Sequence, residues 1–161
     1  MTKLALLRSK RLKAQSKRTS LSIRILKLFY KDTERILNFN DGASVIILSS
    51  IVASTHKPNS SIYQASKAAL NSIAKTAAAE LAPRNIRVNI VSPGPHKTEI
   101  MKKAGLDETT LQHINESLVG QIPLRKLGEA SDVAKIVVSL CNDSFNFTTG
   151  AEIIVDGGMT L

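Results

Sequence analysis

The chain has 161 residues, of which 43% are hydrophobic, and this length suits a single domain with one core. Its single cysteine, Cys141, excludes an internal disulfide, and we expect it to be a small core residue in an apolar helical stretch. No apolar run is long enough to span a bilayer, and the histidines (His56, His96 and His113) lack the spacing of metal ligands. The composition therefore predicts a cytoplasmic protein with neither a membrane segment nor a metal.

Positive charge is concentrated at the amino terminus. Ten of the 22 Lys and Arg residues, and none of the 13 Asp and Glu residues, lie between Met1 and Lys31. Three interpretations stay open: sequence not selected for this fold, which we favour, an organelle transit peptide, and an arm that binds nucleic-acid phosphates. The last is the least favoured, because aromatic residues that could stack on bases are few near the arm. We expect a poorly ordered basic segment at residues 1–20 and one domain at residues 21–161.

The first half of that domain predicts a strand–helix–strand unit. Apolar residues with helical spacing run from Leu21 to Leu37, and a turn at residues 40–42 leads into an apolar strand, Ser44 to Ser49. An Ala-rich helix is predicted from Tyr63 to Ala82, and a second strand from Ile86 to Val91. A crossover of this kind joins parallel strands with a right-handed connection.

The second half predicts two more helices and a last strand. Apolar residues with helical spacing lie between Leu111 and Leu118, and the final strand spans Glu152 to Val155. The apolar face of the helix between them is formed by Val133, Ala134, Val137, Val138 and Cys141. The pattern predicts an α/β fold, a partial doubly wound (Rossmann-like) parallel sheet of about three strands with flanking helices.

Three chemically useful side chains follow the first strand. Ser50 ends the apolar run, Tyr63 follows thirteen residues later, and Lys67 lies four beyond that. Residues four apart share one face of a helix, so Tyr63 and Lys67 can point into one cleft. An ammonium beside a phenol stabilises the phenolate, which makes Tyr63 a candidate general acid/base. Ser50 could hydrogen-bond the same substrate oxygen.

Several segments of the chain resemble the short-chain dehydrogenase/reductase (SDR) family, in the family's order and at its spacings. They are Ser50, Tyr63, Lys67, the stretch Asn85 to Pro95 with Thr98, and the closing stretch Thr149 to Gly158. The resemblance begins near Asp41 and continues to the C-terminus, so the chain resembles the C-terminal portion of such an enzyme.

The resemblance implies an NAD(P)-dependent oxidoreductase that transfers hydride between the nicotinamide and an alcohol/carbonyl substrate. Ser50, Tyr63 and Lys67 would be the catalytic residues. The residues implied to bind NAD or NADP are Tyr63, Lys67, Pro93, Gly94, the backbone of His96, and Thr98. The counterpart of the family's active-site asparagine lies near Ser22, where a serine could replace it only in part.

The family's Gly-rich turn for the cofactor pyrophosphate is absent. No Gly-x-x-x-Gly-x-Gly or Gly-x-Gly-x-x-Gly pattern occurs in the 161 residues, so we expect weak cofactor binding. An alternative hypothesis is a truncated, non-catalytic remnant that acts only through self-association. Under either hypothesis we expect a homo-oligomer, because the first strand has no evident partner on its open side.

Overall fold

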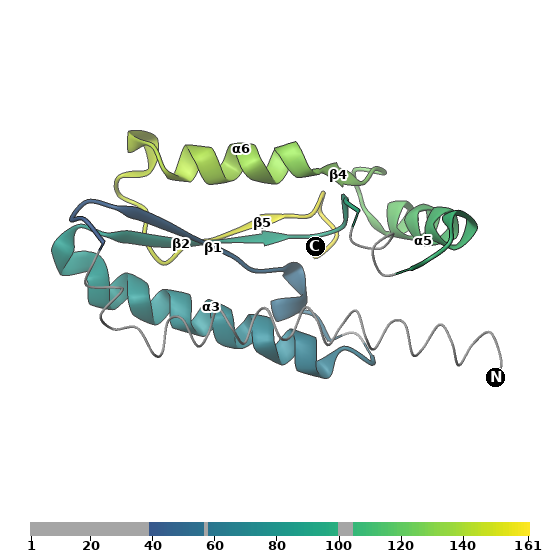
Figure 1. Cartoon of the computed structure of the whole chain (residues 1–161), viewed down its shortest axis with the longest axis horizontal. Coiled ribbons are helices and arrows are strands. Elements are labelled where there is room, and N and C mark those ends of the chain that lie inside the picture. Colours follow the sequence, from purple (N-terminus) through teal and green to yellow (C-terminus); the bar gives the residue numbers. More distant parts are fainter. Residues whose placement is uncertain (1–38, 57, 100–104) are drawn as a thin grey trace.

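The computed structural model describes residues 39–56, 58–99 and 105–161 (Figure 1). The predicted basic segment 1–20, the predicted helix Leu21 to Leu37 and the position of Ser22 lie outside the described residues.

A three-stranded parallel sheet forms the centre of the described fold. Its strands are β1 (Ser44–Leu48), β2 (Arg87–Pro93) and β5 (Glu152–Val155), in the order β1-β2-β5. Leu48 pairs with Val91, and Pro93 pairs with Val155, so the carboxyl ends of the strands lie together at one edge. The predicted Rossmann-like α/β sheet of three strands is confirmed, with strand ends shifted by at most two residues.

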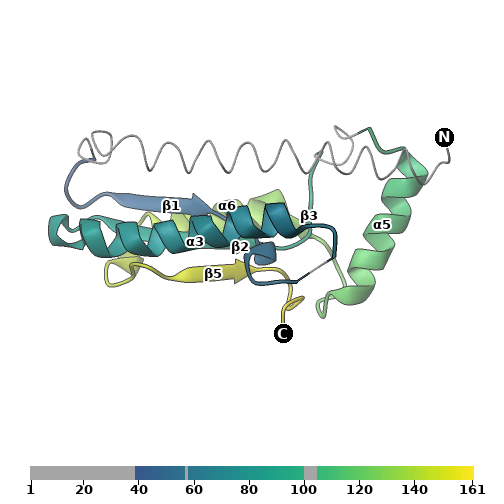
Figure 2. The ribbon, with the colours of Figure 1, turned by 90° about the horizontal axis from the view of Figure 1, so that it is seen from below.

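Helices cover both faces of this sheet. Helix α3 (Ser61–Leu81) packs on one face and α6 (Ala130–Leu140) on the other, while α5 (Glu108–Gln121) lies beyond the strand ends (Figures 1 and 2). The described residues also form three single helical turns: η1 (Ile51–Ala53), η2 (Ala82–Arg84) and η3 (Asp143–Phe145). The sheet is therefore flanked by helices, as the hydrophobic pattern of the sequence predicts.

The alanines of α3 let this helix approach the sheet closely. Ala74, Ala77 and Ala78 are at most 5% exposed and share one core cluster with larger side chains from the sheet, from the residue before β2 and from α3 itself. Those larger residues of the core are Ile47, Leu70, Leu81, Ile86, Val88 and Ile90. Burying a side chain of that size stabilises the fold by about 1.5–3 kcal/mol.

The end of α3 is set by local backbone chemistry. Pro83 lies in η2, directly after the helix, and Asn85 follows with a left-handed backbone at φ 60°. Asparagine tolerates that conformation better than most residues, so the chain can reverse and enter β2 there.

The predicted apolar face of α6 is partly wrong. Val133 and Val137 are half-buried, whereas Ala134, Val138 and Cys141 are exposed. Leu140 takes the core position instead, at 1% exposure, and its carbonyl accepts hydrogen bonds from Ser44 Oγ and Arg87 Nη2, both at 3.0 Å. These bonds hold the last turn of α6 against the sheet through Leu140, so Cys141, which follows as the C-cap, faces solvent.

A second, two-stranded parallel sheet was not predicted. It pairs β3 (His96–Lys97) with β4 (Gly128–Glu129), and Lys97 and Glu129 form an ion pair across it. Strands of two residues are too short to produce an alternating pattern, so hydrophobic periodicity cannot detect them. No helix among the described residues is long and apolar enough to cross a membrane.

We predict that the chain self-associates through the open edge of β1. In the described part of the chain β1 pairs with β2 alone, and Leu48 is 53% exposed. An unpaired strand edge is a template for another strand, and a charge on it opposes such pairing.

We expect sedimentation velocity to show a concentration-dependent oligomer, which Leu48→Lys shifts toward monomer. Leu124→Lys, at a residue that is 64% exposed away from β1, is the matched control. A monomeric wild type with a sharp, concentration-independent melt would contradict this prediction.

Candidate functional site

The candidate site lies where the parallel strands end. β1 continues into Ser49 and Ser50, and the Ser49 N–H donates to the Val91 carbonyl of β2 at 2.8 Å. β2 ends at Pro93 and continues into Gly94. The crevice at the carboxyl ends of the strands is the usual ligand position in an open parallel sheet. The structure therefore brings Ser50 and the Pro93-Gly94 turn to one edge.

The turn that begins at Ser50 leaves the Ser50 hydroxyl able to donate a hydrogen bond. It is the N-cap of η1, and its Oγ accepts a hydrogen bond from the Val52 N–H at 3.3 Å. A serine hydroxyl has one donor and two acceptor positions. Because the turn uses an acceptor position, the hydroxyl hydrogen can still be donated to a substrate oxygen.

Lys67 joins the long helix to the strand that leads to Ser50. Its Nζ donates to the Leu48 carbonyl at 3.1 Å, two residues before Ser50. Tyr63 lies one turn earlier on α3, half-buried, and its carbonyl accepts from Ser66 Oγ at 2.7 Å. Helix α3 packs on η1, so the helix turn that carries Tyr63 and Lys67 lies on the same side of the sheet as Ser50.

Gly94 makes a close contact that no other residue could make. A Cβ at this position would lie 2.5 Å from Asp156 Cβ and 2.9 Å from Asp156 Cα. The Gly94 N–H donates to the Val155 carbonyl at 2.9 Å, so the turn after β2 packs directly on the end of β5. The role of Gly94 in the described fold is thus this contact, beside any role it has in binding.

His96 and Thr98 differ from one another in their surroundings. His96 Nδ1 lies 3.0 Å from the Gly94 carbonyl, and its ring packs on Gly128, where a Cβ would come within 2.4 Å of the ring. Its side chain is therefore part of the β3–β4 contact. Thr98 follows β3 and is exposed, which leaves its hydroxyl accessible. The neighbouring residues 100–104 lie outside the described part of the chain.

One carboxyl near β4 has a shifted pKa. The Glu129 N–H donates to Asp132 Oδ2 at 2.9 Å at the start of α6, and this bond lowers the pKa of the Asp132 carboxyl below its ordinary value. The hydrogen bond favours the charged form, as expected of a capping carboxylate.

Two polar networks behind the strand ends were missed at the level of sequence. Asn89 is fully buried, and its amide donates to the Thr148 carbonyl at 2.8 Å and accepts from the Ala151 N–H at 3.1 Å. Glu152 Oε1 accepts from Asn71 Nδ2 at 2.9 Å and from Ser92 Oγ at 2.6 Å. The sequence signal for both networks is a polar residue within β2, Asn89 for the first and Ser92 for the second, and neither residue identifies its distant partner.

In the described part of the chain, His, Cys, Asp and Glu nowhere form a group of three that could hold a metal ion. The site is instead built from hydroxyl, amine and backbone groups at the ends of parallel strands. This arrangement defines a Rossmann-like α/β protein.

The comparisons with known proteins identify the family. Residues 12–160 match the family model described as "Enoyl-(Acyl carrier protein) reductase". Dehydrogenase/reductase SDR family member 4 of Homo sapiens is 43% identical over 117 residues, which are 73% of this chain and 41% of that protein. The 3-oxoacyl-[acyl-carrier-protein] reductase FabG of Staphylococcus epidermidis is 36% identical over 135 residues, 84% of this chain and 52% of that protein. The chain belongs to the short-chain dehydrogenase/reductase family of oxidoreductases.

Solved structures support the same assignment. A short chain dehydrogenase family protein from Francisella tularensis matches with a TM-score of 0.75 and 29% identity, over 88% of this chain and 60% of that one. The chain thus spans about half the length of the relatives that it matches.

The contact at Gly94 gives a testable stability difference. Gly94→Ala forces a methyl group into the Asp156 backbone, and we expect a loss of about 1–3 kcal/mol in the free energy of unfolding. Gly120→Ala is the control, because a Cβ there meets nothing within 4 Å and alanine favours the helix. Chemical denaturation of both variants measures the difference. Equal stability of the two variants would show that the Gly94 contact is looser than described.

Proposed function

We propose that this chain carries the catalytic segment of an NAD(P)-dependent oxidoreductase that interconverts an alcohol and a carbonyl compound. The observation that carries the proposal is the hydrogen bond from Lys67 Nζ to the Leu48 carbonyl. It ties the helix turn of Tyr63 and Lys67 to the strand that leads to Ser50, which is the association that the chemistry needs.

Each of the three residues has a distinct role in this proposal. Tyr63 exchanges a proton with the substrate oxygen as general acid/base. Ser50 donates its hydroxyl hydrogen to that oxygen as negative charge develops, an oxyanion-stabilising role that leaves its bond from the Val52 N–H intact. Lys67, one helical turn after Tyr63, supplies a positive charge on the same side of α3 and would hold the ribose at the nicotinamide end of the cofactor.

The residues present suit one end of the cofactor only. NAD(P), when bound, supplies or accepts the hydride. Pro93 ends β2, and Gly94, the backbone of His96 and the exposed Thr98 follow it; these residues suit the nicotinamide end of the cofactor. The 161 residues hold no Gly-rich turn that could present backbone N–H groups to the pyrophosphate, so affinity for the cofactor is weak in this chain by itself.

The substrate remains defined by class as a small alcohol/carbonyl pair. The relatives named above include a 3-oxoacyl-[acyl-carrier-protein] reductase, so 3-oxoacyl thioesters belong in a substrate panel together with small alcohols and sugars.

A second candidate function is a non-catalytic protein that acts through self-association. The missing pyrophosphate turn and the half-exposed Leu48 on the edge of β1 favour it. It differs from the first candidate in one measurable property, because it requires no affinity for a nicotinamide cofactor.

Calorimetric titration with NADH and NADPH separates the two candidates. We expect binding at millimolar cofactor to the wild type, and weaker binding to Lys67→Met because the amine contacts the ribose. Lys75→Met, two helical turns further along α3 and exposed, is the matched control. No binding of either cofactor at millimolar concentration would favour the non-catalytic candidate.

Tyr63→Phe tests the chemistry separately from binding. Removing the phenolic hydroxyl removes the proton donor, so turnover of a carbonyl panel falls by about 10²–10⁴-fold while cofactor affinity stays within a few-fold. Spectrophotometric assays of NADPH oxidation measure the first quantity and calorimetry the second. Turnover that is equal in wild type and Tyr63→Phe would remove Tyr63 from the reaction.

A further inference from the structure

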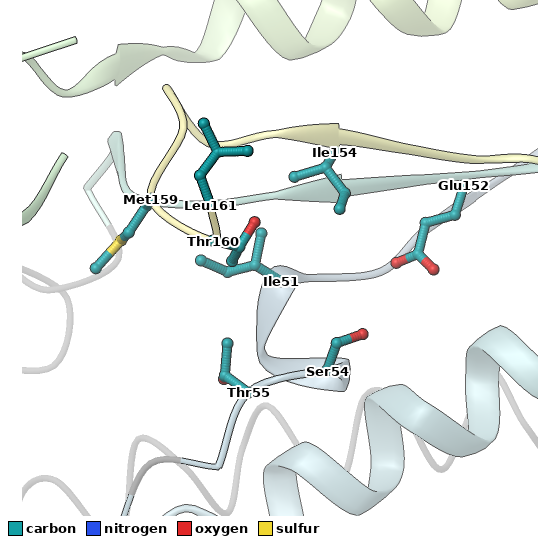
Figure 3. Close-up of a pocket in the computed structure, with 8 residues that line it drawn as sticks. All are labelled: Ile51, Ser54, Thr55, Glu152, Ile154, Met159, Thr160 and Leu161. Carbon is teal, nitrogen blue, oxygen red and sulfur yellow. The ribbon is translucent and has the colours of Figure 1, made fainter. Parts of the chain in front are cut away.

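A cavity lies beside the candidate site, between η1, β5 and the last residues of the chain (Figure 3). Its volume is about 330 Å³, at the lower end of the range for small-molecule sites. The residues that line it are Ile51, Ser54, Thr55, Glu152, Ile154, Met159, Thr160 and Leu161. None of the seven residues assigned above to catalysis or cofactor binding is among them. The cavity is thus a separate feature of the molecule.

Glu152 places a fixed carboxylate in the wall of this cavity. Both hydrogen bonds that it receives from described residues end on Oε1, from Asn71 Nδ2 at 2.9 Å and from Ser92 Oγ at 2.6 Å. Asn71 is 8% exposed and Ser92 is fully buried, so the donors are held by the packed core. The carboxylate is therefore oriented, and Oε2 is left to the cavity. A half-buried carboxylate oxygen gains free energy from a partner that donates to it.

The other polar groups of the cavity are hydroxyls. Thr55 Oγ1 is buried and has no hydrogen-bond partner in the described part of the chain. Ser54 is exposed, and its hydroxyl faces the Glu152 carboxylate across the cavity (Figure 3). Buried polar atoms are normally hydrogen-bonded, so the Thr55 hydroxyl gives the wall of the cavity a polar group that a ligand could bond.

The charges on the residues that line the cavity indicate whether it suits an anionic or a cationic ligand. Among the described residues, no Lys, Arg or His lines the cavity, so the described lining offers no charge that would neutralise a phosphate or a carboxylate ligand. The remaining wall is apolar and consists of Ile51, Ile154, Met159 and Leu161. One acidic side chain, a few hydroxyls and an apolar wall suit a ligand that has one cationic donor on a compact hydrocarbon body.

We propose that this cavity binds a small organic cation, with an ammonium group on Glu152 Oε2 and an apolar skeleton against Ile51 and Ile154. The site is independent of the oxidoreductase proposal, because it uses none of the residues of that reaction. Its ligand is defined here by charge and size: a single ammonium on a body of about six carbon atoms matches the smaller ligand cavities.

Ligand titration of the full 161-residue chain tests the proposal, with cyclohexylammonium as the probe and cyclohexanecarboxylate as its anionic counterpart. We expect saturable binding of the cation, with amide chemical-shift changes at Ser54, Thr55 and Thr160, and at least tenfold weaker binding of the anion. Absence of saturable cation binding, equal affinity for both probes, or shift changes elsewhere on the chain would each overturn the proposal.

Two variants assign the binding to the carboxylate. Glu152→Gln keeps an oxygen acceptor for Asn71 and Ser92 but removes the charge, so cation affinity falls at least tenfold, whereas the control Glu80→Gln, on the exposed side of α3, leaves it unchanged. Ser54→Lys alters only an exposed residue and places an ammonium opposite Glu152, so it abolishes probe binding even if Glu152→Gln does not fold. Undiminished affinity in Ser54→Lys, or in a folded Glu152→Gln, would place the probe elsewhere and refute the assignment.

Discussion

The close approach of Gly94 to Asp156 is the constraint on which the strand-end region depends. With no Cβ at Gly94, the turn after β2 lies directly on the backbone that follows β5. Asp156 is itself fixed, because its carboxylate accepts from the Gly158 N–H at 2.8 Å and from the Thr160 N–H at 2.9 Å. The two strand ends thus hold one another, and Pro93, Gly94 and His96 take their positions from that contact.

The motifs that resemble the family divide into structural and chemical residues. Asn89 and Thr149 serve the fold: Asn89 is buried and bonded to the Thr148 carbonyl, and Thr149 Oγ1 accepts from the Val88 N–H at 3.0 Å. Ser50 and Lys67 differ, because they hydrogen-bond to backbone groups at the edge where the strands end and are not buried in the core. The proposed chemistry therefore needs only a few side chains, and the other motif residues stabilise the fold that positions them.

The sheet could be predicted because its order follows from local patterns. The apolar runs of β1 and β2, joined by a long Ala-rich helix, permit little besides a parallel crossover. The face of α6 could not be placed in this way. Apolar residues lie on more than one side of this helix. The hydrogen bonds from Ser44 and Arg87 to the Leu140 carbonyl decide which side is buried. The β3–β4 pair and the hydrogen bonds to Glu152 join segments that are distant in the sequence. Local sequence patterns therefore cannot predict them.

The candidate site and the cavity share one structural element, and this limits how independently they can change. Ser50 caps η1 through its bond with Val52, while Ile51 and Ser54, at the two ends of the same turn, line the cavity. A side chain or ligand that displaced Ile51 would move the cap and with it the Ser50 hydroxyl. Ile51 is 7% exposed, so such a displacement would also disturb packed neighbours. The geometry of Ser50, the proposed oxyanion-stabilising residue, thus depends on how the neighbouring cavity is filled, even though the two sites share no functional group.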